Sequence, residues 1–342
     1  MLQRLLASSL ALVPLFAQTA PPPRNPAPAA LTAKSFLVDD VQNFTFVDFA
    51  LLRRTGVWDD LAVSALKIAF QRIEKEMGCP FTALDRITAL AKIGDGEGMV
   101  ATEQITVFEG NRELWLPDWV GGPLWSRDER TDGVDVWRSG AARNQIFVRP
   151  GPTVRVEGSE AMIAPVLDGK PWSNRQTPDA MSLLSGGKQD AMHMVVDVGH
   201  PLMRANVLGQ LLPDQQWPEG DEPTFACLRI VVTGEAEDPH LAVVAVLRHQ
   251  KGEAGVKASQ QAAAAMLERL AGMPAMRAGK AMLAKTQVST DGTDLVLTLD
   301  LGRSRDAAGT LAMLVAPVFA RGGEATAEEP PPPAPPGTEP KK

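Results

Sequence analysis

Hydrophobic positions recur every three to four residues between Val57 and Met77, the spacing of one face of an α-helix. Charged residues such as Arg72 and Lys75 fall on the other side, and Gly78 follows as a natural stop. The apolar positions of this stretch are Trp58, Leu61, Ala62, Ala65, Leu66, Ala69, Phe70, Ile73 and Met77. The pattern predicts an amphipathic helix with one buried face.

Strict alternation appears near the other end of the chain. Apolar side chains occupy every second position from Leu295 to Leu301, and Asp291-Gly292 lies just before them. Asp-Gly between alternating segments is among the strongest short-range signals for a β-hairpin. We therefore expect 287–290 and 294–301 to pair as a hairpin with one apolar face.

The same criteria predict further antiparallel pairs and helices. The expected hairpins are 86–93 with 100–109, 145–149 with 153–157, and 224–233 with 241–249, and single strands are expected at 43–49 and 192–198. Helices are expected at 159–167, 202–212, 255–271, 276–285 and 305–314, whereas the stretch from 110 to 144 has no clear period. Hairpins packed against helices indicate an α+β fold.

The elements fall into two similar groups, which we interpret as lobe one (34–188) and lobe two (189–320). Val47-Asp48 precedes Leu51-Leu52-Arg53 in the first, and Val196-Asp197 precedes Leu202-Met203-Arg204 in the second. Each block leads into a helix and then a long hairpin. The resemblance predicts an internal duplication with a ligand groove between the lobes; chance similarity of two α+β layouts is the alternative.

The two ends of the chain have a different character. Arg4 precedes a short apolar run, and small residues follow, so Met1–Ala17 has the layout of a cleaved secretory signal peptide. An N-terminal helix packed on the body is the alternative, but the Pro-rich segment after it argues against one. We expect 18–33 to be a Pro/Ala-rich linker and 321–342 a disordered Pro-rich tail. The predicted location is periplasmic or secreted, as in an exported bacterial protein.

Charge and the remaining hydropathy restrict the partners. The formal net charge is −7, with no long Lys/Arg run, which disfavours nucleic acid and anionic membranes as partners. No segment after the signal reaches the roughly 20 apolar residues of a membrane-spanning helix. A protein or a small molecule is the expected partner, of unknown identity.

Cysteine and histidine are too few to indicate a metal centre. Cys79 and Cys227 could form one disulfide in an oxidising compartment, but we favour two buried thiols because a body of this size needs no covalent link. Four scattered histidines and two cysteines do not make a zinc site. We predict no metal and no cofactor.

One segment has the composition of a binding site. Four tryptophans lie among clustered carboxylates: the tryptophans are Trp115, Trp119, Trp125 and Trp137, and the acids are Asp118, Asp128, Glu129, Asp132 and Asp135. Aromatic faces and paired carboxylates suit glycan binding or hydrolysis. The alternative is that these rings belong to the core. The Gly94–Gly98 stretch resembles a phosphate loop, but a strand follows it, so we interpret it as a turn.

These observations favour a non-enzymatic exported protein that binds a ligand or protein partner through an inter-lobe cleft or a sheet face. The alternative is a cell-envelope glycan-binding protein or hydrolase that uses the tryptophans of 115–137. A third hypothesis is a scaffold that acts through its Pro-rich tail.

Overall fold

The computed structural model describes residues 33–36, 41–63, 67–93, 101–118, 120, 122–128, 134–140, 145–169, 187–209, 212, 215–234, 237–272 and 280–310. All of them belong to the unit Leu31–Lys342. The predicted signal peptide, the tail, almost all of the linker and the Gly94–Gly98 turn lie outside these residues, as do parts of the helices expected at 276–285 and 305–314.

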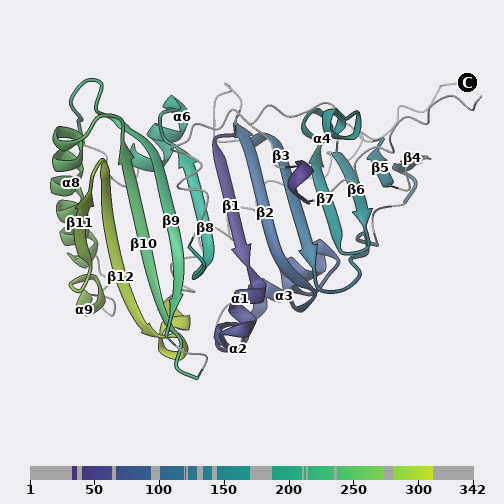
Figure 1. Ribbon diagram of the computed structural model, residues 1–342, viewed down its shortest axis with the longest axis horizontal. Helices are drawn as coiled ribbons and strands as arrows, with labels where there is room; N and C mark the ends of the chain where they lie inside the picture. Colours follow the sequence, from purple (N-terminus) through teal and green to yellow (C-terminus); the bar gives the residue numbers. More distant parts are fainter. Residues whose placement is uncertain are drawn as a thin grey trace, which may run out of the picture. The chain divides into compact units, whose positions relative to one another are not determined.

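The described strands form one antiparallel sheet of twelve, ordered β11-β12-β10-β9-β8-β1-β2-β3-β7-β6-β5-β4 (Figure 1). The first half contains β1 (Asn43–Asp48), β2 (Leu84–Ile93), β3 (Ala101–Gly110), β4 (Trp125–Asp128), β5 (Asp135–Ser139), β6 (Gln145–Gly151) and β7 (Val154–Ser159). The second half contains β8 (Asp190–Asp197), β9 (Pro223–Thr233), β10 (His240–His249), β11 (Gln287–Asp291) and β12 (Asp294–Arg303). The fold is mixed helix and strand with a large antiparallel sheet, as the sequence predicts.

The two halves meet at β1 and β8. Strand β1 pairs with β2 on one side and with β8 on the other, and Thr45 lies directly opposite Met194 in the second ladder. We call this β1–β8 ladder the seam. The two groups of elements that the sequence suggests as lobes are therefore the two halves of a continuous sheet.

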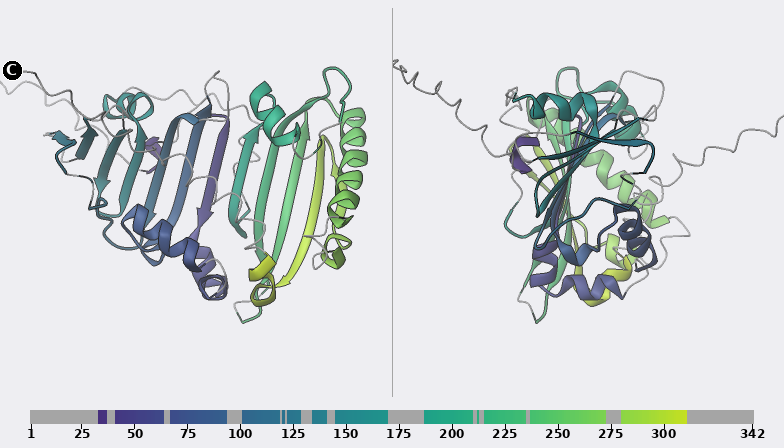
Figure 2. Two further views of the ribbon diagram at one scale, coloured as in Figure 1. Left: turned by 180° about the vertical axis from the view of Figure 1, so that it is seen from behind. Right: turned by 90° about the vertical axis from the view of Figure 1, so that its right-hand side faces the viewer.

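Side chains two residues apart on a strand share a face of the sheet. We call the side that carries Thr45, Val47 and Met192 face one, and the side that carries Phe44 and Val195 face two. Face one lies against helices α1 (Phe49–Arg54), α2 (Val57–Ala62) and α3 (Lys67–Met77) in the first half, and against π-helical η3 (Arg204–Leu208) and α8 (Glu253–Gly272) in the second. Figure 2 (left) shows α3 lying across the strands on this side.

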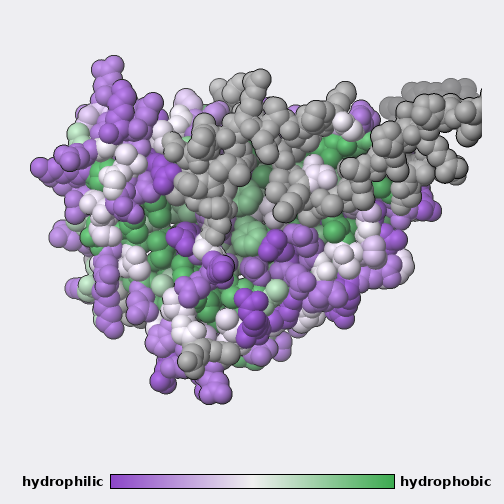
Figure 3. All heavy atoms as spheres, viewed as in Figure 1, coloured by the Kyte–Doolittle hydropathy of each residue, from purple (hydrophilic) through white to green (hydrophobic). Residues whose placement is uncertain are grey.

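Face two of the first half is covered by η1 (Ala33–Phe36) and α4 (Glu160–Leu167). Phe36, Met162 and Ile163 pack there with strand residues such as Val107 and Val156. On face two of the second half a smaller cluster contains the buried residues Val195, Cys227 and Val246, with Phe44, Phe225, Val244 and Val296 packed against it. Figure 3 shows hydrophobic residues in the middle of the visible face and hydrophilic residues around its margin.

Most predicted elements are present, with two clear corrections. The single helix expected over 57–77 is two helices, because α2 ends at Ala62 and α3 begins at Lys67. The hairpin of β4 and β5 lies within 110–144, where the sequence suggested irregular structure. Strand β4 has only four residues and its burial does not alternate, so the period-two signal is missing. The helix expected at 202–212 begins as α6 (Pro201–Met203) and continues as η3.

Both cysteines are free and buried, in agreement with the favoured interpretation of them as small hydrophobic residues. Cys79 belongs to the cluster beneath α1–α3, whereas Cys227 lies on face two. Burial raises the pKa of the Cys79 thiol and raises that of Cys227 to about 12. Neither thiol is suited to nucleophilic chemistry at neutral pH.

Helix α8 is capped by a carboxylate from a distant loop. Asp221 accepts hydrogen bonds from the backbone N–H groups of Lys251 (3.2 Å), Gly252 (3.0 Å) and Gly255 (2.6 Å). Gly255 has to be glycine, because a Cβ there would lie 2.2 Å from the Asp221 carbonyl oxygen. Burial raises the pKa of this carboxyl, but the three N–H donors outweigh burial and leave the pKa below its usual range.

We predict that Asp221→Asn lowers the free energy of unfolding by about 1–2 kcal/mol at pH 7, because a charged acceptor at a helix N-terminus is lost. A depressed pKa stabilises the fold above the carboxyl's unfolded pKa, and that contribution disappears as pH falls through the folded value. Urea denaturation at several pH values should therefore show the two proteins converging below about pH 4. Asp291→Asn in the exposed hairpin turn is the control and should change little.

A buried histidine beside the seam should make stability depend on pH. His193 is 1% exposed, contacts the Phe44 ring edge-on, and its Nε2 has no hydrogen-bond partner among the described residues. Burial lowers the pKa of His193; Asp190 opposes this effect and Arg229 adds to it. A histidine whose pKa is lowered by folding makes the fold more stable above the unfolded pKa of about 6.5 than below it. This stability is lost as the pH falls towards the folded pKa.

In the wild type, His193 should lower the free energy of unfolding between about pH 7 and pH 5, by at most about 1.4 kcal/mol per pH unit. We predict that His193→Phe reduces this slope. Chemical denaturation of both proteins across this range measures the slope. His240→Gln at the exposed end of β10 should leave the slope unchanged. Equal slopes for the wild type and His193→Phe would contradict the assignment.

Candidate functional site

A cavity of about 270 Å³, partly open to the surface, lies on face one where the two halves of the sheet meet. We call it cavity one. Its walls come from the strands of both halves and from the helical segment between β1 and β2. The strand residues are Thr45, Val47, Ile87, Ala191, Met192, Ile230 and Leu241, and the helical residues include Phe49, Leu52, Val57, Trp58, Leu61, Phe70, Ile73, Met77 and Phe81.

Local interactions hold the helices over the strands. Asp48, the last residue of β1, accepts a hydrogen bond from the Leu51 N–H (2.7 Å) and so starts α1 as its N-cap. Gly56 has φ +75°, which turns the chain into α2 at little steric cost. Arg53 then binds Asp85 (2.6 Å) and the Leu84 carbonyl, fixing α1 to the start of β2.

Four aromatic rings form one continuous side of cavity one. Phe49 stacks on Phe81 with ring centres 4.9 Å apart, and Trp58 stacks on Phe70 at 5.3 Å. Phe49 and Trp58 then meet edge to face at 5.7 Å. Aromatic pairs at such distances are mutually stabilising beyond the area they bury, so this wall is pre-formed.

The chemistry of cavity one is almost entirely apolar. Among the described lining residues only Thr45 and Trp58 have a polar side-chain group, and the Thr45 hydroxyl donates to Asn43 Oδ1 (3.4 Å). A polar ligand would lose its hydration there without compensating hydrogen bonds, at a cost of several kcal/mol. Hydrocarbon groups, which need no hydrogen-bond partner, match such a lining.

The tryptophans predicted as ligand-binding lie away from cavity one. Trp125 and Trp137 belong to β4 and β5, half-buried, and Trp125 packs on Phe147 at 5.2 Å. Trp115 is 61% exposed, and Arg149 lies over its ring at 5.0 Å. Trp119 lies outside the described residues. The structure thus places three predicted residues at one end of the sheet.

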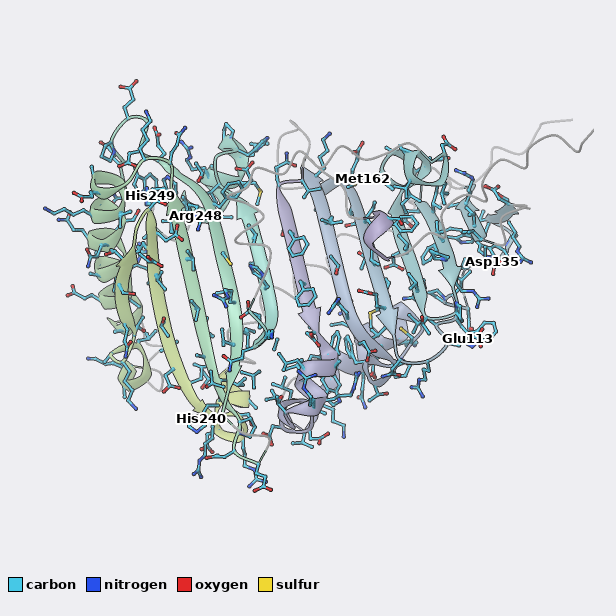
Figure 4. The ribbon with its side chains drawn as sticks, viewed as in Figure 1. Glu113, Asp135, Met162, His240, Arg248 and His249 are labelled. Atoms are coloured by element: carbon cyan, nitrogen blue, oxygen red, sulfur yellow. The ribbon has the colours of Figure 1, made fainter. Side chains whose placement is uncertain are left out.

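The acids near these tryptophans are engaged by arginines. Asp135 and Glu113, both labelled in Figure 4, pair with Arg149 at 3.3 and 3.5 Å. Asp128 pairs with Arg138 at 2.8 Å. A pair of catalytic carboxylates facing a sugar needs free acid and base groups, and these three side chains are committed to ion pairs instead. Glu129 and Asp132 lie outside the described residues.

The described part of the chain does hold a serine–histidine contact. Ser259 Oγ lies 3.0 Å from His249 Nε2, and His249 Nδ1 lies 2.8 Å from the Asp221 carbonyl oxygen. The Trp217 indole can only donate, so it donates to Ser259 (2.7 Å), which in turn donates to His249. All three groups are thereby satisfied, and Ser259 is fully buried. The arrangement anchors α8 and offers no activated nucleophile.

Sequence reasoning did not predict cavity one as a site. The helical period correctly identified Trp58, Leu61, Phe70, Ile73 and Met77 as one face, but this pattern alone indicates ordinary core packing. The strand residues from the second half, such as Met192 and Ile230, join them only because β8 pairs with β1. No local signal encodes that pairing.

Comparisons with known proteins add little. No protein-family model and no curated protein matches the chain. Among solved structures, crystal form III of TP0453 matches with a TM-score of 0.46 and 9% identity over 83% of this chain and 99% of that one. Crystal form I gives 0.45 and 9% over 84% and 99%. A likeness at this level of identity concerns the course of the backbone and carries no functional conclusion.

Two further features concern the described residues alone. No three His, Cys, Asp or Glu side chains among them are arranged to hold a metal ion. Within the same residues, no helix combines the length and the apolar character required to cross a bilayer.

The tryptophans at the sheet end should differ in structural importance. We predict that Trp115→Ala lowers the free energy of unfolding by less than about 1 kcal/mol, because it removes only an exposed ring and its contact with Arg149. Trp125→Ala should cost about 2 kcal/mol, since its ring packs on Phe147. Urea denaturation of the two variants measures both values, and equal losses would contradict these placements.

Proposed function

We propose that this chain is an exported, non-enzymatic protein that binds a small apolar molecule in cavity one. The observation that carries the proposal is the cavity itself: about 270 Å³, bounded by both halves of the sheet and walled by hydrocarbon and aromatic side chains. The sequence suggested a ligand groove between two lobes, and a site bounded by both halves of the sheet supports that general idea, although none of its lining residues was expected to bind a ligand.

The apolar wall of cavity one favours apolar ligands and disfavours charged ones. Each methylene transferred from water into such a site contributes about 0.8 kcal/mol, whereas a charged group would enter without a partner. The favoured ligand is an uncharged aromatic or aliphatic group larger than the benzene that a cavity of roughly 150 Å³ can hold.

Binding without reaction fits the composition of the wall. The described lining residues of cavity one include no His, Asp, Glu, Lys, Arg, Cys or Ser. General acid–base or nucleophilic catalysis needs such a group within hydrogen-bond reach of the substrate. Capture, storage or transfer of an apolar compound needs only burial.

Export and duplication form part of the same proposal. The N-terminal segment predicts cleavage after Ala17 and a periplasmic or secreted product. A carrier of apolar compounds would have a clear use in either location, because such compounds dissolve poorly in water. An origin of the two halves in an internal duplication is supported by the matching order of strands outward from the seam. Glycan binding by Trp115, Trp125 and Trp137 stays a separate prediction.

Titration with naphthalene, a fluorescent uncharged hydrocarbon, tests the function. We predict saturable binding to the wild type and at least a tenfold loss of affinity in Val47→Phe, because the larger ring extends from β1 into cavity one. Val63→Phe makes the same change at a position that is 82% exposed and should bind like the wild type. Equal affinity of all three folded proteins would refute the proposed site.

A further inference from the structure

A second apolar cavity of about 230 Å³ lies on the same face of the sheet, within its second half. We call it cavity two. Its strand residues are Met194, Val196, Ala226, Cys227, Leu228, Ala245, Val246, Leu247, Leu295 and Leu297, and its helical residues include Val207, Leu208, Ala263 and Met266. Cavity one begins at Thr45 and Val47 on β1, and cavity two begins at Met194 and Val196 on the adjacent strand.

Every opposed pair of an antiparallel ladder lies on a local two-fold, so the seam permits an internal two-fold at these two starting points and the neighbouring hairpins must select it. Thr45 lies opposite Met194, and the separation between them (194 minus 45, or 149 residues) also carries Val47 to Val196. Adding 149 to a residue number of β1, and subtracting 149 from one of β8, turns the pair Phe44–Val195 into the pair His193–Phe46, which is also observed. A two-fold axis perpendicular to the sheet, through Thr45 and Met194, would require this exchange.

The correspondence continues through the neighbouring hairpins. A shift of 139 residues carries β3, Ala101–Gly110, onto the bounds of β10, His240–His249. The same shift carries the cross-strand pair Ile87–Phe108 onto Ala226–Leu247, a pair observed between β9 and β10. The hairpin of β2 and β3 thus matches the hairpin of β9 and β10, including the pairing between the strands, at a single offset of 139 residues.

The outer strands match in backbone detail. Val107 pairs with Val156 in the first half, and Val246 pairs with Val296 in the second. Gly110 N–H donates to the Thr153 carbonyl (2.8 Å), and the equivalent His249 N–H donates to the Thr293 carbonyl (2.9 Å). The order β1-β2-β3-β7-β6 in one half therefore corresponds to β8-β9-β10-β12-β11 in the other.

The two cavities share one pair of equivalent strand positions in this scheme, although cavity one also takes Met192, Ile230 and Leu241 from the second half and no described first-half residue lines cavity two. Val47 and Ile87, a cross-strand pair lining cavity one, correspond to Val196 and Ala226, a cross-strand pair lining cavity two. In each half the helical segment that follows the central strand supplies a wall of the cavity. Asp48 and Asp197 both accept backbone N–H groups at the end of that strand.

We propose that cavity two is a second binding site for a small apolar ligand, so that one chain carries one site at the seam and another in the second half of its sheet. The inference rests on the proposed function of cavity one. The described lining of cavity two contains no aromatic side chain, so its preferred occupant is a flexible aliphatic chain, which adapts to a wall of Leu, Val, Ala and Met.

The lining of cavity two includes one hydroxyl. Ser259 lines cavity two, and its hydroxyl is held by Trp217 and His249. Because Ser259 is fully buried and its Oγ accepts from Trp217 and donates to His249, this hydroxyl is engaged within the protein and the cavity stays apolar.

Calorimetric titration with octanol tests the proposal, using symmetry-matched variants of the full chain. We expect two bound molecules per wild-type chain. Val47→Phe should remove one site, Val196→Phe should remove the other, and the double variant should bind none. Val63→Phe on the exposed surface should retain both. Ala263→Leu closes cavity two from α8 and replaces Val196→Phe if that variant does not fold.

The outcomes separate this inference from the proposed function. One bound octanol that is lost only in Val47→Phe would overturn the second site and leave cavity one intact. One bound octanol that is lost only in Val196→Phe would overturn both the two-site proposal and the function of cavity one. No binding at all would overturn both, and two sites that respond to their own variants would establish both.

Discussion

The antiparallel ladder between β1 and β8 is the contact on which the remaining architecture depends. It joins two sets of strands that would otherwise each end in an open edge, and it does so in the interior of the strand order. Cavity one exists only because this ladder brings Met192 and Ile230 beside Val47 and Ile87. The ladder also encloses His193 and Phe44, so the most deeply buried titratable ring lies next to the join.

The sequence predicts local elements well where their periodicity is strong. The hairpin of β11 and β12 follows from alternation and an Asp-Gly turn, and the apolar stripe of α2 and α3 follows from helical spacing. Strands β4 and β5 escape prediction because they are short and half-exposed, with no alternating pattern. Their pairing depends on contacts with β6, including the aromatic contact of Trp125 with Phe147.

The candidate site is far less predictable than the elements that build it. Helical periodicity identifies the residues on one wall, but it cannot distinguish a wall from a filled core, because both need the same apolar side chains. The decisive information is the long-range pairing of β1 with β8, which depends on the whole sheet and not on any nearby residue. The tryptophan-rich composition instead indicated the end of the sheet near β4, β5 and β6, where arginines pair with Asp128, Glu113 and Asp135.

The described sheet is open, and its two outermost strands are the shortest in their respective halves. Strand β4 has four residues and β11 has five, and both carry charged side chains such as Arg127 and Asp291. Short, charged borders offer few free backbone groups in a row for strand addition by a neighbouring molecule. The borders of this sheet are therefore poor templates for edge-to-edge pairing between copies of the chain.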